Sequence, residues 1–292
     1  MSDVVTGAFS YTRRAIAARL LADGRPVCTL SRAGPGPGDP EIQAFPLRFD
    51  DPAPFRGADT FYNTYWIRFE HGGMTFDQAV ENTLTLFRTA RDAGVRRIVH
   101  ISVSNPSPDS PYPYFRGKAE IERRLAQLGI ERSIVRPTLV FGSKDIIVNN
   151  IAWILRRFPL FLVPRGEYSV QPVAVEDVAR LAVETGAGTV DAAGPETLTF
   201  LELVQAVAQV VRSPARIVRS SPGLALAVTR LADLALRDIV LTRDELGGLR
   251  DSLLVSHDPP TGAVRFTDWL AANGETLGRS YVSELARNWR QR

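Results

Sequence analysis

The stretch VVTGAFSYTRRAIAARLLADG, residues 4–24, decides the fold of this chain. A short apolar run leads into a turn that contains Gly7, and the segment after the turn places Ile16 and Leu20 on one helical face before Gly24 ends it. A strand, a glycine-containing turn and a helix in this order begin a βαβ unit, whose helix N-terminus can bind an anion through backbone N–H groups and the helix dipole. The sequence therefore predicts a phosphate-binding turn.

The turn departs from the dinucleotide pattern G-x-x-G-x-x-G at two of its three glycines. Gly7 matches the first, whereas Ser10 and Arg13 occupy the other two positions, with Tyr11 and Thr12 between them. Ser10 is small and can donate to a phosphate, but Arg13 cannot provide the close helix–strand packing of a glycine. Either the turn is adjusted or the Arg13 side chain swings outward. A turn that only links a strand to a helix is the alternative for this segment.

Short β-rich runs continue to alternate with helical segments through the first half of the chain. The expected strands are 3–5, 27–30, 44–49, 59–63, 97–102 and 133–141, and the expected helices are 13–22, 76–93 and 112–128. Such alternation produces a parallel sheet covered on both faces. The predicted fold class is α/β, a Rossmann-type doubly wound parallel sheet with a smaller, mostly helical C-terminal lobe.

Beyond Gly142 this alternation breaks down. Helices are expected at 146–157, 178–185, 200–211 and 223–236, with a strand at 169–175. We expect residues 1–145 to form an NAD(P)-binding Rossmann domain, to which 169–186 return, and residues 146–168 and 187–292 to form the lobe on the substrate side. The segment AGPGPGDP, residues 33–40, predicts a surface loop that either contacts the cofactor or serves as a linker.

The end of the second strand indicates which dinucleotide the turn would bind. It reads Thr29-Leu30-Ser31-Arg32, without the carboxylate that binds an adenosine ribose 2′-hydroxyl. Arg32 suits the 2′-phosphate of NADP, so NADP is the preferred cofactor and NAD the alternative. Asp50, after the third strand, can accept from the adenine amino group, although solvent explains an exposed carboxylate equally well.

The most specific signal is the pair Tyr114 and Lys118. The two residues are four apart, so they share one face of the predicted helix. A lysine beside a tyrosine favours the phenolate and brings its pKa toward the working pH, which a general acid/base requires. Tyr112 is a competing phenol, but its fourth neighbour is Arg116, which is too basic to tune a proton transfer.

Further polar and aromatic residues follow the fourth and fifth strands. Ser102 and Ser104 can each donate to a substrate carbonyl or alkoxide, or else cap a loop. Asn63, Tyr65 and Trp66 are expected to line the substrate cleft, and ordinary core packing is the alternative for all three.

Four segments together resemble the short-chain dehydrogenase/reductase superfamily in order and spacing. They are TGAFSYT (6–12), RIVHIS (97–102), YFRGK (114–118) and RPTLVFG (136–142). PVAVEDVAR (172–180) is similar to a segment of the atypical and extended branch, which contains NmrA-like proteins, epimerase-like members and the nucleotide-binding accessory subunit of complex I. The resemblance implies that Tyr114 and Lys118 carry proton transfer, that Lys118 also binds the nicotinamide ribose, and that Ser102 orients the substrate.

Composition restricts the other possibilities. The 292 residues, 45% hydrophobic and 23% charged, can bury one large core or a core with an attached lobe. The net charge of +3 is spread along the chain, so we expect no nucleic-acid partner. A single cysteine, Cys28, excludes an internal disulfide and a cysteine-rich metal site, and we expect no metal. The first ten residues lack the pattern of a signal peptide, which favours a cytoplasmic location.

Two apolar stretches, 146–163 and 223–241, approach the hydrophobicity of membrane segments. Each contains charges that disfavour a bilayer span, so both are interpreted as helices of the C-terminal lobe, and we expect no membrane association. Surface attachment through 223–241 is a minor alternative.

These patterns favour an NAD(P)-dependent oxidoreductase or epimerase acting on a small carbonyl or hydroxyl substrate held between the two lobes. The alternative is a non-catalytic NADP(H)-binding protein that serves regulation or assembly. A homodimer is compatible with either function.

Overall fold

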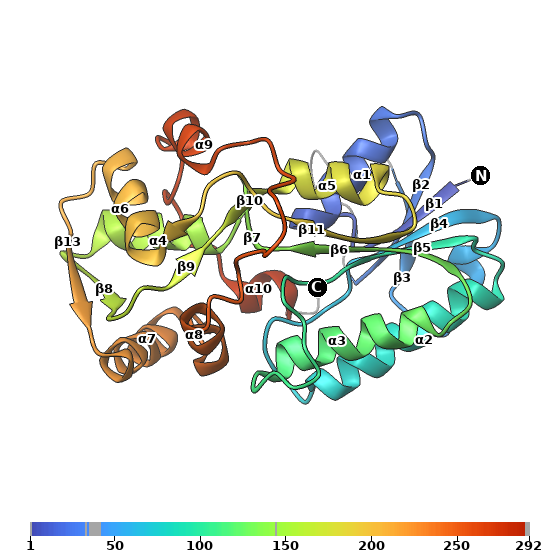
Figure 1. Cartoon of the computed structure of the whole chain (residues 1–292), viewed down its shortest axis with the longest axis horizontal. Coiled ribbons are helices and arrows are strands. Elements are labelled where there is room, and N and C mark those ends of the chain that lie inside the picture. Colours follow the sequence, from blue (N-terminus) through green and yellow to red (C-terminus); the bar gives the residue numbers. More distant parts are fainter. Residues whose placement is uncertain (1, 33, 35–41, 144, 290–292) are drawn as a thin grey trace. The chain divides into compact units, whose positions relative to one another are not determined.

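The computed structural model describes residues 2–32, 34, 42–143 and 145–289 of the chain. The chain divides into two compact units, whose elements are labelled in Figure 1. Unit 1 comprises Met1–Pro137 and Val175–Ala192, and unit 2 comprises Thr138–Ala174 and Ala193–Gln291.

Unit 1 is built, in its described part, on a sheet of seven parallel strands. Across the sheet the strands are β11 (Gly188–Ala192), β6 (Glu131–Pro137), β5 (Arg97–Ile101), β4 (Ala58–Asn63), β1 (Ser2–Thr6), β2 (Val27–Ser31) and β3 (Gln43–Pro46). Helices α1 (Tyr11–Ala22) and α5 (Val175–Glu184) pack together on one face, and α2 (Phe76–Asp92) and α3 (Pro113–Ala126) pack together on the other (Figure 1). A short 3₁₀ helix (Ala53–Phe55) precedes β4. This arrangement confirms the predicted Rossmann-type fold.

The strand order reverses between β1 and β4. From β1 the chain proceeds outward through β2 and β3, and it then returns to β4 on the other side of β1. The carboxyl ends of the two strands are joined by Thr6 and Thr64, because the Thr64 N–H donates to Thr6 Oγ1 (2.8 Å) and the Thr64 hydroxyl donates to the Thr6 carbonyl (2.8 Å). Open α/β sheets bind their ligands at such a reversal, outside the carboxyl ends of the strands.

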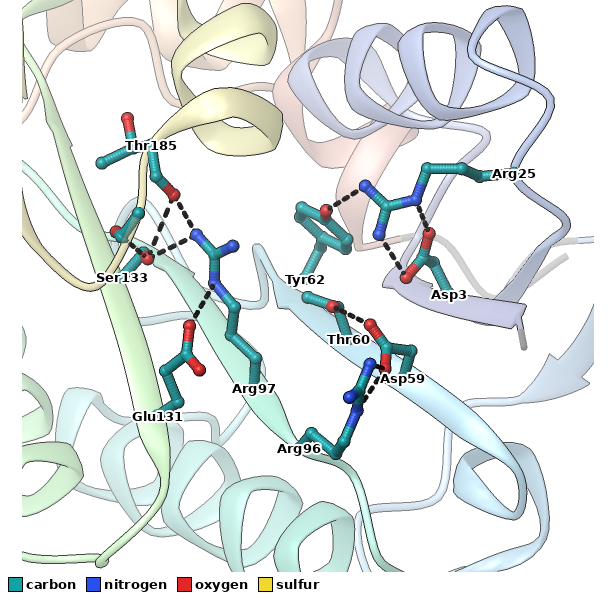
Figure 2. A network of polar contacts seen from close by, with 11 residues as sticks. Asp3, Arg25, Asp59, Thr60, Tyr62, Arg96, Arg97, Glu131, Ser133 and Thr185 are labelled. Atoms are coloured by element: carbon teal, nitrogen blue, oxygen red, sulfur yellow. Dashed lines mark hydrogen bonds and ion pairs between the residues drawn. The ribbon is translucent and has the colours of Figure 1, made fainter.

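The amino ends of the strands are held by a network of charged and polar side chains (Figure 2). Arg25 bonds to Asp3 and Tyr62, Arg96 to Asp59, and Arg97 to Glu131, Ser133 and the Thr185 carbonyl. These charges are therefore used to tie neighbouring strands and the end of α5 together. The candidate catalytic and cofactor-binding residues lie at the opposite end of the sheet, near the carboxyl ends of its strands.

Unit 2 surrounds a core of aliphatic and aromatic side chains that includes Phe141, Leu155, Leu203 and Phe266, all of them fully buried. Its described helices are α4 (Ile147–Arg157), α6 (Phe200–Val210), α7 (Pro222–Leu236), α8 (Arg243–Arg250), α9 (Phe266–Asn273) and α10 (Glu284–Asn288). Three small sheets pair β7 (Leu139–Phe141) with β10 (Pro172–Ala174), β8 (Leu160–Pro164) with β13 (Arg216–Ser220), and β9 (Ser169–Val170) with β12 (Leu198–Thr199). Among the described residues, every helix is too short or too polar to cross a lipid bilayer.

Several boundaries differ from those expected from the sequence. The run 133–141 forms two strands in different units, and 169–174 pairs within unit 2, so the segment that returns to the large sheet is 175–192. The apolar stretch 146–163 ends its helix at Arg157 and continues as β8, because β13 provides a pairing partner. The expected loop at 33–40 lies outside the described residues except for Gly34.

Candidate functional site at the carboxyl ends of the strands

The turn after β1 is fixed by hydrogen bonds to β2. Gly7 has φ +67°, a conformation that favours glycine, and its N–H donates to the Leu30 carbonyl (2.6 Å). The Ala8 N–H donates to the Thr29 hydroxyl (2.9 Å), which itself donates to the Val5 carbonyl (2.7 Å). Thr29, a position that sequence reasoning did not single out, therefore holds the turn against both strands. The N–H groups of Gly7 and Ala8 therefore already have acceptors within the fold.

The N-terminus of α1 suits an anion. Ser10 is the N-cap residue in extended conformation, and its side chain makes no capping hydrogen bond. The first turn, which includes Tyr11 and Thr12, contains no acidic residue that would neutralise the positive end of the helix dipole. The Ser10 hydroxyl, half-buried beside this turn, is thus placed to donate to a bound phosphate.

Arg13 folds back over the turn instead of swinging outward. A Cβ atom added to Gly7 would lie only 2.6 Å from Nη1 and 2.9 Å from Cδ of Arg13. The space that a third glycine would leave open is therefore filled by the Arg13 side chain, and a positive charge stands where a pyrophosphate would approach. The turn can accept such a ligand if the guanidinium pairs with its phosphates as it moves aside.

Lys118 is buried on α3, with only 2% of its surface exposed. Its Nζ donates to the Ile101 carbonyl (2.8 Å) and lies 4.9 Å from the ring centroid of Trp66, which adds a cation–π contact. Burial lowers the pKa of Lys118 to about 7, against the raising effect of Glu122 and with a smaller lowering effect of Arg13. The amine therefore changes its charge close to neutral pH.

Tyr114 lies one helical turn before Lys118, and Trp66 contacts both. The half-buried Tyr114 ring packs edge-on against Trp66 (5.8 Å between centroids) and Phe76 (6.1 Å). Gly117 provides the space for this indole, since a Cβ there would lie 2.7 Å from Trp66 Cη2. The structure thus brings together Trp66, Tyr114 and Lys118, which were predicted as site residues from the sequence. It adds Gly117, whose role no sequence pattern indicated.

Ser102 and Ser104 follow β5 and are both buried. Their N–H groups donate to the carbonyls of Val135 (2.7 Å) and Pro137 (2.9 Å), which fixes the backbone between β5 and β6. Among the described residues Ser102 Oγ has no hydrogen-bond partner, although it is fully buried. A buried hydroxyl without a partner costs free energy, and a substrate or cofactor oxygen would satisfy it. Ser102 directly follows Ile101, the residue whose carbonyl binds Lys118.

Asn63 and Tyr65, also expected to line the substrate cleft, instead form hydrogen bonds within unit 1. Asn63 is fully buried, with its amide nitrogen 3.0 Å from His100 Nδ1, and the buried Tyr65 accepts from the Asn82 amide (3.1 Å). Of the three, Trp66 alone joins Tyr114 and Lys118, and Asn63 and Tyr65 contribute to the core.

Arg32 and Asp50 are exposed, at the end of β2 and shortly after β3. Both positions are compatible with the adenosine half of a dinucleotide, and the contacts expected of them stay predictions.

Comparison with known proteins gives no matching family model. Among curated proteins, the chain is 30% identical over 266 residues to the uncharacterized protein Rv2047c of Mycobacterium tuberculosis, covering 85% of this chain and 28% of the relative. It thus spans little more than a quarter of the mycobacterial proteins that it matches. It is also 24% identical over 251 residues to the mitochondrial NADH dehydrogenase [ubiquinone] 1 alpha subcomplex subunit 9 of Arabidopsis thaliana, covering 77% of this chain and 61% of that protein.

Solved structures show the same fold. MoeE5 in complex with UDP-glucose and NAD has a TM-score of 0.69 at 15% identity, covering 94% of this chain and 98% of MoeE5. A nucleoside-diphosphate-sugar epimerase from Staphylococcus aureus has a TM-score of 0.68 at 16% identity, covering 93% and 100%. The chain therefore has the Rossmann-type fold of these solved structures. With the likeness to the NADH dehydrogenase subunit, this confirms its resemblance to the atypical and extended branch of the short-chain dehydrogenase/reductase superfamily.

Proposed function

We propose that this chain is an NAD(P)-dependent oxidoreductase or epimerase whose proton-transfer group is Tyr114. The observation that carries the proposal is the cluster of Tyr114, Trp66 and the buried Lys118 beside the unpartnered hydroxyl of Ser102. A lysine buried with a pKa near 7 is an unusual structural residue, because an apolar side chain would fill the same volume without the loss of hydration. Its retention next to a phenol fits a catalytic role.

The turn after β1 fits a dinucleotide in shape and charge. Gly7 allows a close backbone approach, Ser10 offers a donor, and the uncompensated N-terminus of α1 favours a pyrophosphate. Arg13 would hold the phosphates once it leaves the turn, and Arg32 favours NADP over NAD. When bound, the nicotinamide would supply or accept the hydride.

The protein's own residues would manage the proton and orient the substrate. Tyr114 would donate its phenolic proton to the oxygen of a carbonyl, or remove the proton of a hydroxyl in the reverse direction. Protonated Lys118 would favour the phenolate by its charge, and the phosphates of a bound dinucleotide would raise its pKa above the value near 7. Ser102 Oγ would donate a hydrogen bond to the same substrate oxygen.

The nucleotide is the first point to test. Mass spectrometry of the purified protein should identify a copurifying NADP or NAD, and thermal shifts should be larger with NADP. Solved structures of this fold include complexes with NAD, and a larger shift with NAD would reverse the preference that rests on Arg32. No shift with either dinucleotide would overturn the proposal.

The catalytic assignment is tested by Tyr114→Phe, with Tyr112→Phe as the matched control. Tyr112 is a buried phenol on the same segment. Tyr114→Phe should lower turnover by about a hundredfold or more while the thermal shift with dinucleotide stays unchanged, because it removes only the proton donor. Tyr112→Phe should retain turnover. UDP-sugars should be assayed first, since solved structures of this fold are complexes with them, followed by a panel of small carbonyl compounds.

A non-catalytic NADP(H)-binding role in regulation or assembly is the second candidate. Arg13 filling the phosphate turn favours it, as does the relative that is a subunit of NADH dehydrogenase. Tight dinucleotide binding without turnover on either substrate class would support this candidate against the enzyme.

A further inference from the structure

Helix α7 exposes an apolar stripe to solvent. Leu224, Val228, Leu231 and Leu234 are spaced four, three and three residues apart, so they lie along one side of the helix. Their exposed fractions are 51%, 42%, 67% and 78%. The opposite side faces the core of unit 2, where Ala225 is buried. The helix is thus apolar on both faces, although only one of them has a partner among the described residues of unit 2.

The small sheet next to α7 extends this surface. Strand β13 ends at Ser220, α7 begins two residues later, and α7 packs against β8 (Figure 1). Leu160 on β8 and Val218 on β13 are exposed, as is Phe158 just before β8. Leu160 pairs in register with Arg216, and Leu162 pairs with Val218. Because side chains alternate along a strand, Leu160 and Val218 share the face of this small sheet that points away from the core. We call these residues and the α7 stripe the apolar surface of unit 2.

Positive charge accompanies the apolar surface. Residues 212–237 contain five arginines and a single acidic residue, Asp233, whose carboxylate accepts a hydrogen bond from the Val240 N–H (2.7 Å). Arg216, Arg219, Arg230 and Arg237 are exposed, and within the described part of the chain their guanidinium groups form no ion pair.

Some exposed arginines of unit 1 have a carboxylate partner, such as Arg19 with Glu184 and Arg123 with Glu120. Others, such as Arg48 and Arg56, form no ion pair within the described part of the chain. Residues 212–237 are distinguished by having unpaired arginines in the same segment as exposed leucines and valines.

We propose that unit 2 binds the surface of an anionic lipid membrane, with α7 lying in the plane of the interface. Leucines and valines on one side of a short helix can enter the boundary between headgroups and acyl chains, while arginines bind lipid phosphates. At 15 residues, α7 is far shorter than a bilayer span. The proposal revises the expectation of no membrane association, and it is independent of the catalytic proposal.

Charge favours lipid over a second copy of the chain as the occupant. A two-fold symmetric contact places the same patch of both subunits face to face. On this surface it would bring exposed arginines of the two copies, among them Arg216 and Arg230, close to one another, which is unfavourable. Anionic headgroups supply the missing negative charge.

Vesicle sedimentation tests the proposal with the full chain. The protein should pellet with phosphatidylcholine vesicles that contain phosphatidylglycerol, pellet less with pure phosphatidylcholine, and be released by high salt. Leu231→Glu should weaken binding by about tenfold or more, because a leucine removed from an apolar environment loses most of its transfer free energy. Val264→Glu, which adds the same charge at another exposed apolar position of unit 2, should bind as the wild type does.

A fluorescent probe gives a second readout that does not depend on pelleting. Cys28 is buried, and burial raises the pKa of its thiol to about 11, so an environment-sensitive dye should label Leu231→Cys selectively. Its emission should shift to the blue when anionic vesicles are added, and the same dye on Val264→Cys should not respond. Equal circular dichroism of all variants controls for folding.

Two results would overturn the proposal. One is failure of the wild type to bind anionic vesicles by both methods. The other is a blue shift at Leu231→Cys that follows protein concentration instead of lipid, together with a dimer in analytical ultracentrifugation, because this would assign the surface to a second copy.

Discussion

Replacing Lys118 with methionine should change the pH dependence of stability in a way that tests its burial directly. Methionine has nearly the volume of the lysine stem and carries no charge. It removes the hydrogen bond to the Ile101 carbonyl and the charge above Trp66, and it leaves the rest of α3 unchanged. Turnover should be lost as well, because no other described amine adjoins Tyr114 in unit 1.

The size of the effect on the free energy of unfolding follows from the shifted pKa of Lys118. Burial lowers the pKa of Lys118 from 10.5 to about 7. At about 1.4 kcal/mol for each pH unit, a shift of this size disfavours the folded state by roughly 5 kcal/mol when the amine is protonated in both states. Below pH 7 this destabilisation is present in full. Between pH 7 and 10.5 the unfolded chain keeps the proton that the folded chain has lost, so raising the pH favours the folded wild-type protein.

Urea unfolding of both proteins at pH 6, 8 and 9.5 measures this effect. The free energy of unfolding of the wild type, relative to Lys118→Met, should rise by about 1.4 kcal/mol for each pH unit above 7 and stay level below it. Other titrating groups cancel in the difference, and the lost hydrogen bond shifts the difference by a constant amount without changing its slope with pH. Parallel pH profiles of the two proteins would refute the conclusion that Lys118 titrates near neutral pH.

Two further substitutions test the surroundings of this amine. Gly117→Ala would ordinarily stabilise a helix by about 1 kcal/mol, but the contact of its Cβ with Trp66 should make it destabilising by about 1 kcal/mol and lower turnover. Gly223→Ala, where a Cβ meets nothing within 4 Å, is the control in denaturant titrations, and equal effects of both would contradict a tight fit at Trp66. Arg13→Gly should weaken dinucleotide binding by about tenfold in calorimetry, because it removes a charge-assisted contact to phosphate. Tighter binding would instead identify Arg13 as an obstruction and favour the regulatory role.

Local patterns predicted the sheet of unit 1 well. Each strand from β1 to β6 is a short β-rich run, and helices separate β1 from β2, β4 from β5 and β5 from β6. The position of Tyr114 and Lys118 on one helix face depends only on their spacing of four residues. Features that depend on distant partners were not predictable in this way. β8 looks like a continuation of the apolar segment that forms α4, and it becomes a strand because β13, more than fifty residues later, pairs with it.

Contacts within the candidate site likewise depend on residues that are distant in the sequence, so they were not predictable from local patterns. Nothing around Gly117 indicates that Trp66, fifty-one residues earlier, requires its missing side chain. The Thr29 hydroxyl that fixes the turn at Ala8 is likewise contributed by the neighbouring strand. The direction of the Arg13 side chain, left open by the sequence, depends on the shape of the turn that it covers.

The division of the chain has a consequence for its synthesis. The polypeptide passes from one unit to the other after Pro137, Ala174 and Ala192. Among the described strands, β11 is the last of the large sheet and pairs with β6 alone. A nascent chain that has left the ribosome only as far as Pro137 therefore presents β6 as an open edge, and it lacks α5 to cover α1. Open edges of this kind recruit other strands. Gene fragments that stop before β11 should consequently aggregate, and a soluble form of unit 1 would need 175–192 joined to β6 by a short engineered linker.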